Sequence, residues 1–347
     1  VLGTTSYGDI VKALEEAVAG NHFEEFRDID YLPDTGSKRV LTTGGHFGYL
    51  KIAEGCDKHC TYCIIPKLRG RFRSVPMERL VAQAEDMAEQ GVKELILVAQ
   101  ETTVYGKDLY GKKSLHILLK KLCEIRGIRW IRVLYCYPEE IYDELIETIR
   151  DEKKICHYLD IPIQHASDRI LKRMGRRTSK QELIDIIGKL RKEIPDIVLR
   201  TTLITGFPGE TEEDHEELKE FVDEMEFDRL GVFTYSPEEN TPAAEMADQV
   251  PEEVKEERRD ELMELQQEIS YDRGQDRIGQ ELLVMIEGKV ADESAYIGRT
   301  YGDAPKVDGY IFVQTGELLM TGDFAKVRVT GALEYDLIGV LSDEYTE

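Results

Sequence analysis

The amino-acid sequence predicts an α/β protein in which a partial barrel of six β-then-α units is followed by a small all-β barrel. Three observations support this prediction. Between residues 48 and 272, short apolar runs alternate with longer segments of helical periodicity, which indicates a parallel sheet covered by helices. A loop with three closely spaced cysteines follows the first apolar run. Over residues 273–347 the chain changes to short apolar runs separated by Gly-containing turns, as in small β-barrels.

The charge balance of the chain is strongly acidic. Its 347 residues include 69 acidic and 45 basic side chains, which gives a net charge of −24. Lys and Arg provide most of the affinity for phosphate backbones, so this balance argues against RNA binding unless a local basic patch exists. The same charge can steer basic proteins toward the chain, or it can simply keep the chain soluble.

Two further features concern the environment of the protein. The longest apolar runs, such as residues 95–99, are too short to cross a bilayer, so no membrane association is expected. Three of the six cysteines share one candidate ligand loop, which favours a reducing, cytoplasmic location.

Residues 1–47 do not show the pattern of a complete fold. Apolar residues at helical spacing predict a helix over residues 10–18. The polar, Gly-rich stretch from residue 20 to residue 48 is typical of a linker. We therefore do not expect residues 1–47 to form a domain of their own.

The six units of the partial barrel begin at residue 49. Their strands are expected at residues 49–53, 94–99, 130–135, 158–163, 197–202 and 230–235. Their helices are expected at residues 76–90, 114–125 (capped by Ser114), 138–151, in segments up to residue 192, and at 211–225. A closed barrel of this kind needs eight units, so six units predict an open one. An open doubly wound sheet is the alternative, but no G-x-G-x-x-G follows any of these strands.

The remaining elements follow the partial barrel. Residues 251–271 predict a long charged helix that packs onto the barrel as a strut, through an inner apolar stripe. The stripe consists of Val254, Leu262, Leu265 and Ile269. The strands of the final small barrel are expected at residues 282–286, 310–313, 325–330 and 337–341.

The cysteine loop is the main candidate for chemistry. Cys56, Cys60 and Cys63 have the spacing C-x3-C-x2-C, and no fourth cysteine is close by. Thiolates select iron–sulfur clusters, zinc or copper(I). A cubane cluster usually takes four cysteines, so three would leave one iron open to bind another molecule. Zinc completed by His59 or a remote ligand is the alternative, but His59 adjoins Cys60 and could not easily bind the same ion.

Other site candidates stand at the carboxyl ends of the predicted strands, where parallel barrels carry their active sites. They are Gln100, Glu101 and Thr102; Tyr135 to Pro138; Gln164 and His165; Thr205 to Glu210; and Tyr235 and Ser236. We expect them to converge on one rim. Gln100 and His165 could instead only satisfy backbone groups at strand ends. Likewise, the turn with Gly206 and Gly209 could be a simple helix entry with Thr211 as the N-cap.

The cysteine loop carries a family resemblance. The run GCDKHCTYCIIPKLRGRFRS at residues 55–74 resembles the radical S-adenosylmethionine (SAM) methylthiotransferases, and the resemblance covers nearly the whole chain. It implies one [4Fe-4S] cluster held by Cys56, Cys60 and Cys63, with SAM bound to the open iron. LVAQETTVYGKD at residues 97–108 resembles the motif that meets the SAM amino group, and TTLITGFPGET at residues 201–211 resembles the glycine turn under SAM. The implied cofactor-binding residues are Tyr62, Gln100, Glu101, Gln164, Thr205, Gly206 and Gly209.

Within that family, two segments indicate a branch. LDIPIQHASDRILKRMGRR at residues 159–177 and RWIRVLYCYPEE at residues 129–140 resemble the enzymes that add a methylthio group to an aspartate β-carbon in a small-subunit ribosomal protein. The tRNA-modifying branch usually reads Q-S-G-S where this chain has Gln-His-Ala-Ser at residues 164–167. The resemblance also implies an electron donor such as flavodoxin or ferredoxin, and a second cluster on a domain upstream of residue 1. Residues 1–47 are then expected to be the remnant of that domain plus a linker.

The C-terminal residues resemble the TRAM domain that ends these enzymes, which is basic and grips RNA in the tRNA-modifying relatives. Residues 274–347 carry 14 acidic and 6 basic residues, so the substrate is expected to be a basic ribosomal protein, and RNA binding is not expected. The acidic residues expected on the docking face are Asp303, Asp308, Glu317 and Asp323. The alternatives are a tRNA methylthiotransferase and a non-enzymatic metal-binding module that docks on the ribosome.

Two smaller groups of residues, one basic and one of cysteines, have no role implied by the resemblance. The basic residues just past the cysteine loop could be a solvated surface or could bind an anion such as a substrate carboxylate. These are Lys67, Arg69, Arg71 and Arg73. The three dispersed cysteines, Cys123, Cys136 and Cys156, are expected to be structural, because a buried free cysteine behaves as a small hydrophobic residue.

Overall fold

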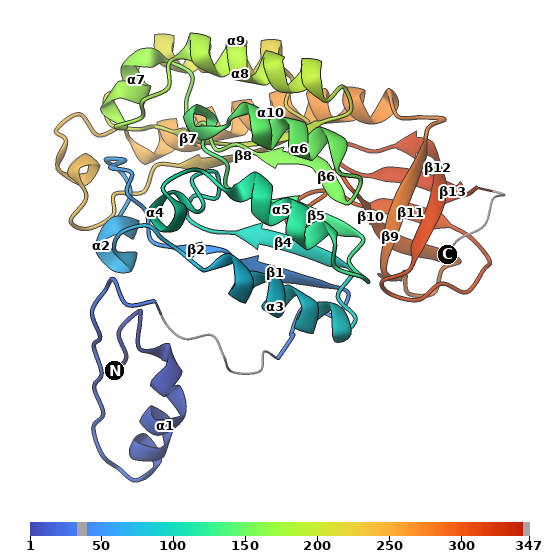
Figure 1. Cartoon of the computed structure of the whole chain (residues 1–347). Coiled ribbons are helices and arrows are strands. Elements are labelled where there is room, and N and C mark those ends of the chain that lie inside the picture. The colour runs from blue at the N-terminus through green and yellow to red at the C-terminus, as the bar shows by residue number, and fades with distance from the viewer. Residues whose placement is uncertain (33–39, 343–347) are drawn as a thin grey trace.

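The computed structural model describes residues 1–32 and 40–342, and it confirms the partial barrel (Figure 1). Six parallel strands pair in the order β1-β4-β5-β6-β7-β8, so consecutive units lie side by side. Within the described ranges β1 and β8 do not pair with each other, which leaves the barrel open. The strands are β1 (Phe47–Lys51), β4 (Glu94–Val98), β5 (Trp130–Val133), β6 (Ile155–Asp160), β7 (Val198–Thr205) and β8 (Arg229–Thr234).

Helices cover the outer face of this sheet. Alternate strand residues point to opposite faces, so every second residue of a strand packs against these helices. In β4, Leu95 and Leu97 belong to the main hydrophobic cluster together with helix residues such as Leu80 and Leu118. Their neighbour Glu94 therefore faces the inside of the barrel. The covering helices are α3 (Met77–Glu89), α5 (Leu115–Cys123), α6 (Asp143–Asp151), α8 (Lys180–Glu193) and α9 (Glu212–Met225).

Shorter elements connect these units. The short helices are η1 (Tyr7–Asp9), α2 (Ile65–Arg69), α4 (Lys107–Tyr110), η2 (Pro138–Glu140), α7 (Asp168–Arg173) and η3 (Pro242–Glu245). A two-stranded ladder of β2 (Ala53–Glu54) and β3 (Arg73–Ser74) flanks the cysteine loop.

Several predicted boundaries were wrong. β6 begins at residue 155 instead of 158, and β7 continues to residue 205 instead of ending at 202. The predicted helix 138–151 is divided into η2 and α6, because Tyr142 has an extended backbone with φ −139° and ψ 162°. The Tyr142 hydroxyl is hydrogen-bonded to Nδ1 of His116 at 2.9 Å. This tertiary contact outweighs the local helix propensity.

Ser114 precedes α5 as predicted, but its side chain does not cap the helix. Its hydroxyl instead donates to the carbonyl of Lys112 at 3.0 Å.

The long helix α10 (Glu252–Gln275) packs against β7, β8 and α9, as the strut prediction requires. Leu262 and Ile269 of the predicted stripe are buried, whereas Val254 and Leu265 are only half-buried. The prediction of an apolar stripe was incomplete, because polar residues are buried on the same face. These are Lys255, Arg258, Gln266 and Ser270.

The C-terminal residues form a closed five-stranded barrel in the order β10-β11-β13-β12-β9, as predicted for the fold class. Its strands are β9 (Glu281–Lys289), β10 (Ala295–Thr300), β11 (Ile311–Gln314), β12 (Phe324–Ala332) and β13 (Leu337–Leu341). β10 was missed from the sequence, because Gly298 and the fully buried Arg299 interrupt its apolar pattern. A Cβ atom on Gly298 would lie 2.3 Å from Cγ1 of Val284, so the close approach of β9 requires glycine there.

The C-terminal barrel covers the amino ends of the parallel strands, opposite the end that carries the cysteine loop (Figure 1). Trp130, the first residue of β5, contacts Phe324 of β12 edge-on at 4.9 Å between ring centroids. Together with Tyr158, Val198 and Met285 these rings belong to a hydrophobic cluster shared by both units.

This contact corrects the expected docking face, because two of its acidic residues are buried. Asp303 forms an ion pair with Arg229 at 2.6 Å. Asp308 lies 3.4 Å from Nε of Arg200 and accepts a hydrogen bond from Tyr158 at 2.8 Å. Both carboxylates neutralise arginines of the parallel sheet and are not presented to a partner.

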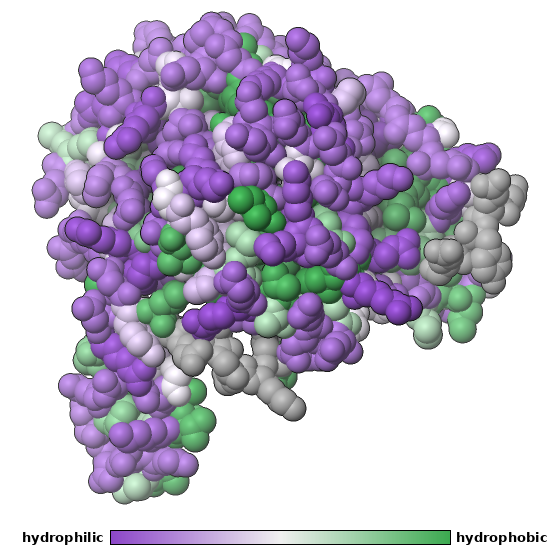
Figure 2. Space-filling view, in the orientation of Figure 1, coloured by the Kyte–Doolittle hydropathy of each residue, from purple (hydrophilic) through white to green (hydrophobic). Residues whose placement is uncertain are grey.

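The N-terminal residues form a small lobe beside the barrel (Figure 1). The predicted helix is confirmed as α1 (Ile10–Val18), and its apolar residues Ile10, Leu14 and Val18 are exposed. The rest of the visible face is dominated by hydrophilic side chains (Figure 2), in keeping with the high charge. None of the helices in the described ranges is long and apolar enough to cross a membrane.

Candidate metal and cofactor site

The backbone around the cysteine loop is tightly enclosed. Gly55 has φ +77°, and a Cβ atom there would lie 2.1 Å from the carbonyl oxygen of Arg71. The amide of Cys56 donates to the carbonyl of Gly70 at 3.2 Å, and the amide of Cys63 donates to that of Cys60 at 3.1 Å. The loop that carries the three thiols is therefore held from both sides.

The three thiols of the loop are free and at least partly buried. Burial raises the pKa of Cys56 to about 11 and also raises that of Cys63. Without metal the thiols of Cys56 and Cys63 stay protonated at neutral pH, so metal binding must displace their protons.

No three His, Cys, Asp or Glu side chains in the described ranges are grouped so that they could hold a single metal ion. In a cubane each thiolate binds a different iron, so its ligand sulfurs need not converge on one point. The donor set, three free cysteines on one enclosed loop, fits such a cluster.

An acidic group surrounds Lys58, which stands between the first two cysteines. Its ammonium lies 2.7 Å from Glu140, 3.2 Å from Glu139 and 3.6 Å from Glu101. Burial raises the pKa of Glu101 to about 7, although Lys58 and the hydroxyl of Thr103 both lower it. A cavity of about 380 Å³ opens here and is lined by residues that include Cys56, Glu101 and Glu140. The structure thus brings Glu101 to the cysteine loop, as predicted.

Gln100 and Gln164 occupy strand ends as predicted. The side-chain amide of Gln100 donates to Glu54 at 3.4 Å, and its Oε1 has no hydrogen-bond partner within the described ranges. Gln164 has φ +73° and bridges to Leu203 of the neighbouring strand. Such a conformation costs a non-glycine residue about 1–3 kcal/mol and is concentrated at functional sites.

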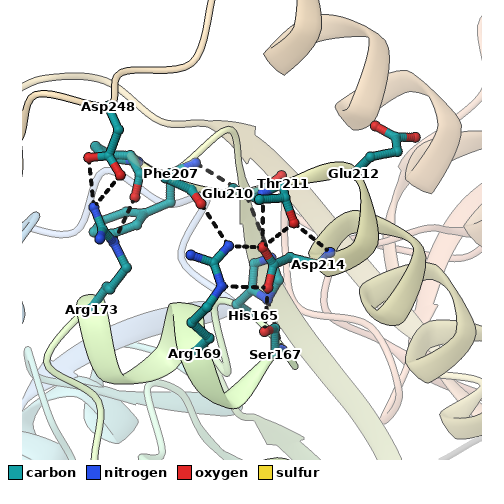
Figure 3. A network of polar contacts seen from close by, with 12 residues as sticks. His165, Ser167, Arg169, Arg173, Phe207, Glu210, Thr211, Glu212, Asp214 and Asp248 are labelled. Carbon is teal, nitrogen blue, oxygen red and sulfur yellow. Dashed lines mark hydrogen bonds and ion pairs between the residues drawn. The ribbon is translucent and has the colours of Figure 1, made fainter.

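Arginines from α7 and α10 contact the turn after β7, and Figure 3 shows Arg169 and Arg173 of α7. Three consecutive carbonyls of the turn each accept a hydrogen bond from one arginine. The pairs are Pro208 with Arg173 at 3.0 Å, Gly209 with Arg169 at 2.7 Å, and Glu210 with Arg258 at 3.3 Å. Gly206 has φ +68° and lies directly over Lys255. The turn is therefore rigid and cannot accept side chains at its glycines.

Glu210 stabilises the turn itself and connects it to two other segments, the residues after β6 and helix α10. Its carboxylate accepts the amide of Phe207 at 3.2 Å, pairs with Arg258 at 3.0 Å and lies 3.6 Å from Nε2 of His165. Burial by itself raises the pKa of Glu210, but His165, the backbone of the turn and Arg258 together hold it below its usual value.

His165 and Thr211 have the structural roles that were expected as alternatives to a role in the site. Nδ1 of His165 accepts the amides of Ala166 at 3.0 Å and Ser167 at 2.9 Å, so it satisfies backbone groups. Thr211 begins α9 with a capping box completed by Asp214. The hydroxyl of Thr205 donates to the carbonyl of Lys255 at 3.1 Å, so it points toward α10 and away from the rim.

The cysteine loop and the glycine turn are in contact through aromatic residues. Tyr62 contacts Phe207 edge-on at 6.4 Å between ring centroids, and Phe207 contacts Tyr235 at 5.4 Å. The amide of Thr61 also donates to the carbonyl of Met174 at 2.9 Å, which connects the loop to the end of α7.

Sequence reasoning missed the residues that support the site from α7 and α10. Lys255 and Arg258 stand three residues apart on the inner face of α10, and the charge pattern of that helix hides them among solvent-facing charges. A signal was nevertheless present, because Lys255 stands seven residues before Leu262 of the predicted apolar stripe, a spacing that places both on one face of a helix.

The basic residues past the loop are largely engaged within the chain. Lys67 donates to the carbonyl of Asn240 at 2.6 Å, Arg69 lies 3.9 Å from Glu54, and Arg73 pairs with Asp30 at 3.1 Å. This argues against the anion-binding interpretation. Cys136 and Cys156 are buried and Cys123 is half-buried, with no disulfide among the six cysteines, all of which are described.

Comparison with known proteins places this geometry in context. A model of the radical SAM superfamily matches residues 50–222, and one of the TRAM domain matches residues 278–341. The chain is 65% identical over 339 residues to "Ribosomal protein uS12 methylthiotransferase RimO" of Lachnoclostridium phytofermentans, covering 98% of this chain and 77% of that protein. It is 52% identical to a Clostridium perfringens protein of the same name, covering 99% of this chain and 77% of the relative.

A solved structure with a similar fold is coproporphyrinogen III oxidase (HemN) from Escherichia coli, described as a radical SAM enzyme. Its TM-score is 0.51 at 16% identity, and the match covers 81% of this chain and 66% of that one. At this identity the likeness concerns the fold alone.

Proposed function

The chain belongs to the RimO family of radical SAM methylthiotransferases, and on this premise we propose that it adds a methylthio group to an aspartate β-carbon of ribosomal protein uS12. The observation that carries the proposal is the meeting of three motifs at one end of the barrel. The cysteine loop contacts the glycine turn through Tyr62 and Phe207, and it contacts Glu101 through Lys58.

We propose that Cys56, Cys60 and Cys63 hold a [4Fe-4S] cluster with SAM at the open iron. When bound, the cluster and SAM supply the one-electron chemistry that breaks an unactivated C–H bond, which side-chain acids and bases cannot do.

The residues of the chain would hold SAM in place. The Glu101 carboxylate and the amide of Gln100 would receive its amino-acid part, and the Tyr62 backbone would border the adenine. The rigid turn at Thr205, Gly206 and Gly209 would support SAM from below, beside Gln164. The cavity next to Cys56 and Glu101 supports this arrangement.

The charge of the chain supports a basic protein substrate. Exposed carboxylates on the C-terminal barrel, such as Asp292, Glu293, Glu317 and Glu334, would repel RNA and attract a basic ribosomal protein. We therefore favour uS12 over tRNA as the substrate.

Turnover requires components beyond this site. A flavodoxin or ferredoxin would supply electrons, and a second cluster would supply sulfur. Only three of the six cysteines share a loop, so the second cluster would be bound by a segment that this sequence does not contain. In this division of roles, residues 48–272 carry the radical chemistry and residues 273–347 contact the substrate protein.

Anaerobic reconstitution tests the proposal. The chain should bind about four irons and cleave SAM after reduction, and Cys→Ala at residue 56, 60 or 63 should abolish the visible absorbance of the cluster. Cys123→Ala, outside the loop, is the matched control and should keep it.

Absorbance that survives in all three loop variants would disprove the ligand assignment. One bound zinc without SAM cleavage would favour the metal-binding module, and product formed on tRNA but not on uS12 would overturn the substrate.

A further inference from the structure

One of the three cysteines, Cys60, has an environment unlike the other two. The hydroxyl of Tyr137 lies 3.7 Å from Cys60 Sγ. The guanidinium of Arg176 stacks on the Tyr137 ring, with Cζ 4.3 Å from the ring centroid. Cys60, Tyr137 and Arg176 also line a cavity of about 210 Å³ beside the loop.

The Arg176 guanidinium is buried without a full set of partners. The residue is only 7% exposed, and its Nη2 donates to the carbonyl of Pro162 at 2.8 Å. Its Nε and Nη1 atoms have no hydrogen-bond partner, and it forms no ion pair, within the described ranges. A buried cation is costly unless a negative charge compensates it.

The chain holds this cation at Cys60 through close backbone contacts. Gly175 has φ +74°, and a Cβ atom there would lie 2.8 Å from the carbonyl oxygen of His59. The hydroxyl of Thr61 donates to the carbonyl of Arg173 at 2.9 Å. The end of α7 is thus fastened to the cysteine loop, and Arg176 has little freedom to turn away.

We propose that Tyr137 and Arg176 tune the cluster at Cys60 by raising its reduction potential; this inference rests on the proposed function. A cysteine bound to iron is a thiolate and can only accept hydrogen bonds, so the Tyr137 hydroxyl must be the donor. Reduction adds one negative charge to the cluster. A hydrogen-bond donor and a buried cation beside a ligand sulfur stabilise that added charge, and such contacts set the potential of iron–sulfur centres.

The test is a redox titration of the reconstituted full chain, followed by electron paramagnetic resonance of the reduced cluster. Tyr137→Phe removes the donor and keeps the ring under Arg176, so the midpoint potential should shift to a more negative value. Arg176→Gln removes the charge and should shift it further in the same direction.

Two control variants accompany these. Arg177→Gln removes the same charge from an exposed neighbour, and Tyr271→Phe removes a hydroxyl from the exposed side chain of α10. Arg177→Gln should shift the potential much less than Arg176→Gln, and Tyr271→Phe should not shift it.

Unchanged potentials in Tyr137→Phe and Arg176→Gln would overturn the inference, and so would an equal shift in Arg177→Gln. If Arg176→Gln fails to retain the cluster, Tyr137→Phe decides alone. SAM cleavage by the unaltered chain is measured separately. A chain that cleaves SAM but shows no shifts refutes only this inference, whereas shifts without SAM cleavage refute only the proposed function.

Discussion

Glu94 of β4 and Arg299 of β10 form a fully buried ion pair, with 2.6 Å between Oε2 and Nη2, that joins the parallel sheet to the C-terminal barrel. The other oxygen of Glu94 accepts from Nε of Arg132 at 2.8 Å. Although burial by itself raises the pKa of Glu94, the two arginines hold it below its usual value. Buried opposite charges therefore connect the two units, and Arg299 also pairs with Glu287 of its own barrel at 2.6 Å.

Replacement of Glu94 by Gln should destabilise the chain by about 3–5 kcal/mol, because it removes the carboxylate that pairs with the buried Arg132 and one of the two that pair with Arg299, the other being Glu287. Urea unfolding can be followed by the fluorescence of Trp130, the only tryptophan, which contacts Phe324 across the same interface. Glu334→Gln, on an exposed loop of the C-terminal barrel, should change stability by less than about 0.5 kcal/mol. Equal effects of the two substitutions would contradict the role of Glu94.

Replacement of Gly206 by Ala should distort the turn that is proposed to support SAM. The new Cβ would lie 2.1 Å from Cγ of Lys255, at a backbone φ of +68°. We expect a loss of about 1–3 kcal/mol in stability and weaker SAM binding by the reconstituted chain, measured by equilibrium dialysis. Gly188→Ala in α8, where no atom lies within 4 Å of the new Cβ, should instead add about 0.5–1 kcal/mol. Unchanged SAM binding in Gly206→Ala would show that the turn is not part of the SAM site.

Asp214 should make the stability of the chain depend on pH. Burial opposes ionisation, but hydrogen bonds from Arg169, Thr211 and Ser167 hold the pKa of Asp214 well below its usual value. A folded-state pKa below the unfolded value gives stability that is present above about pH 4 and is lost as the pH falls further. Asp214→Asn should therefore cost about 1–2 kcal/mol at pH 7, and the difference from the unaltered chain should shrink below about pH 4.

Urea unfolding at several pH values measures this difference. Asp223→Asn, on the exposed face of the same helix, is the control and should show no such dependence. A difference that stays constant down to pH 3 would contradict the lowered pKa of Asp214.

Charge reversal on the C-terminal barrel should slow association with uS12. Changing Asp292, Glu293 and Glu317 to Lys should lower the association rate about tenfold at low salt, because electrostatic steering acts mainly on encounter. The effect should fade as the ionic strength rises. Stopped-flow mixing at two salt concentrations measures it, with Glu253, Glu256 and Glu257 of α10 reversed as the control. An equal slowing in the control would assign the effect to net charge and not to this surface.

Local patterns were sufficient to predict most of the architecture. Alternating periodicities predicted six β-then-α units, because the side-chain periods of strands and helices differ and can be read along the chain. The spacing of Cys56, Cys60 and Cys63 predicted that the three cysteines share one loop, since all three stand within eight residues; their role as metal ligands stays a prediction. The capping box at Thr211 was readable for the same reason.

Only the tertiary structure decided which charged residues are exposed on the surface and which form buried structural ion pairs. From the sequence, Asp303 and Asp308 were predicted to belong to a docking face. In the structure they pair with Arg229 and Arg200 at the interface between the two units. Arg176, in a run of basic residues, lies buried against Tyr137 beside Cys60. Such roles depend on contacts between segments distant in sequence, whereas a charge pattern carries only local information. The sequence by itself thus determined the elements and the position of the cysteine loop, and long-range packing decided which charges surround them.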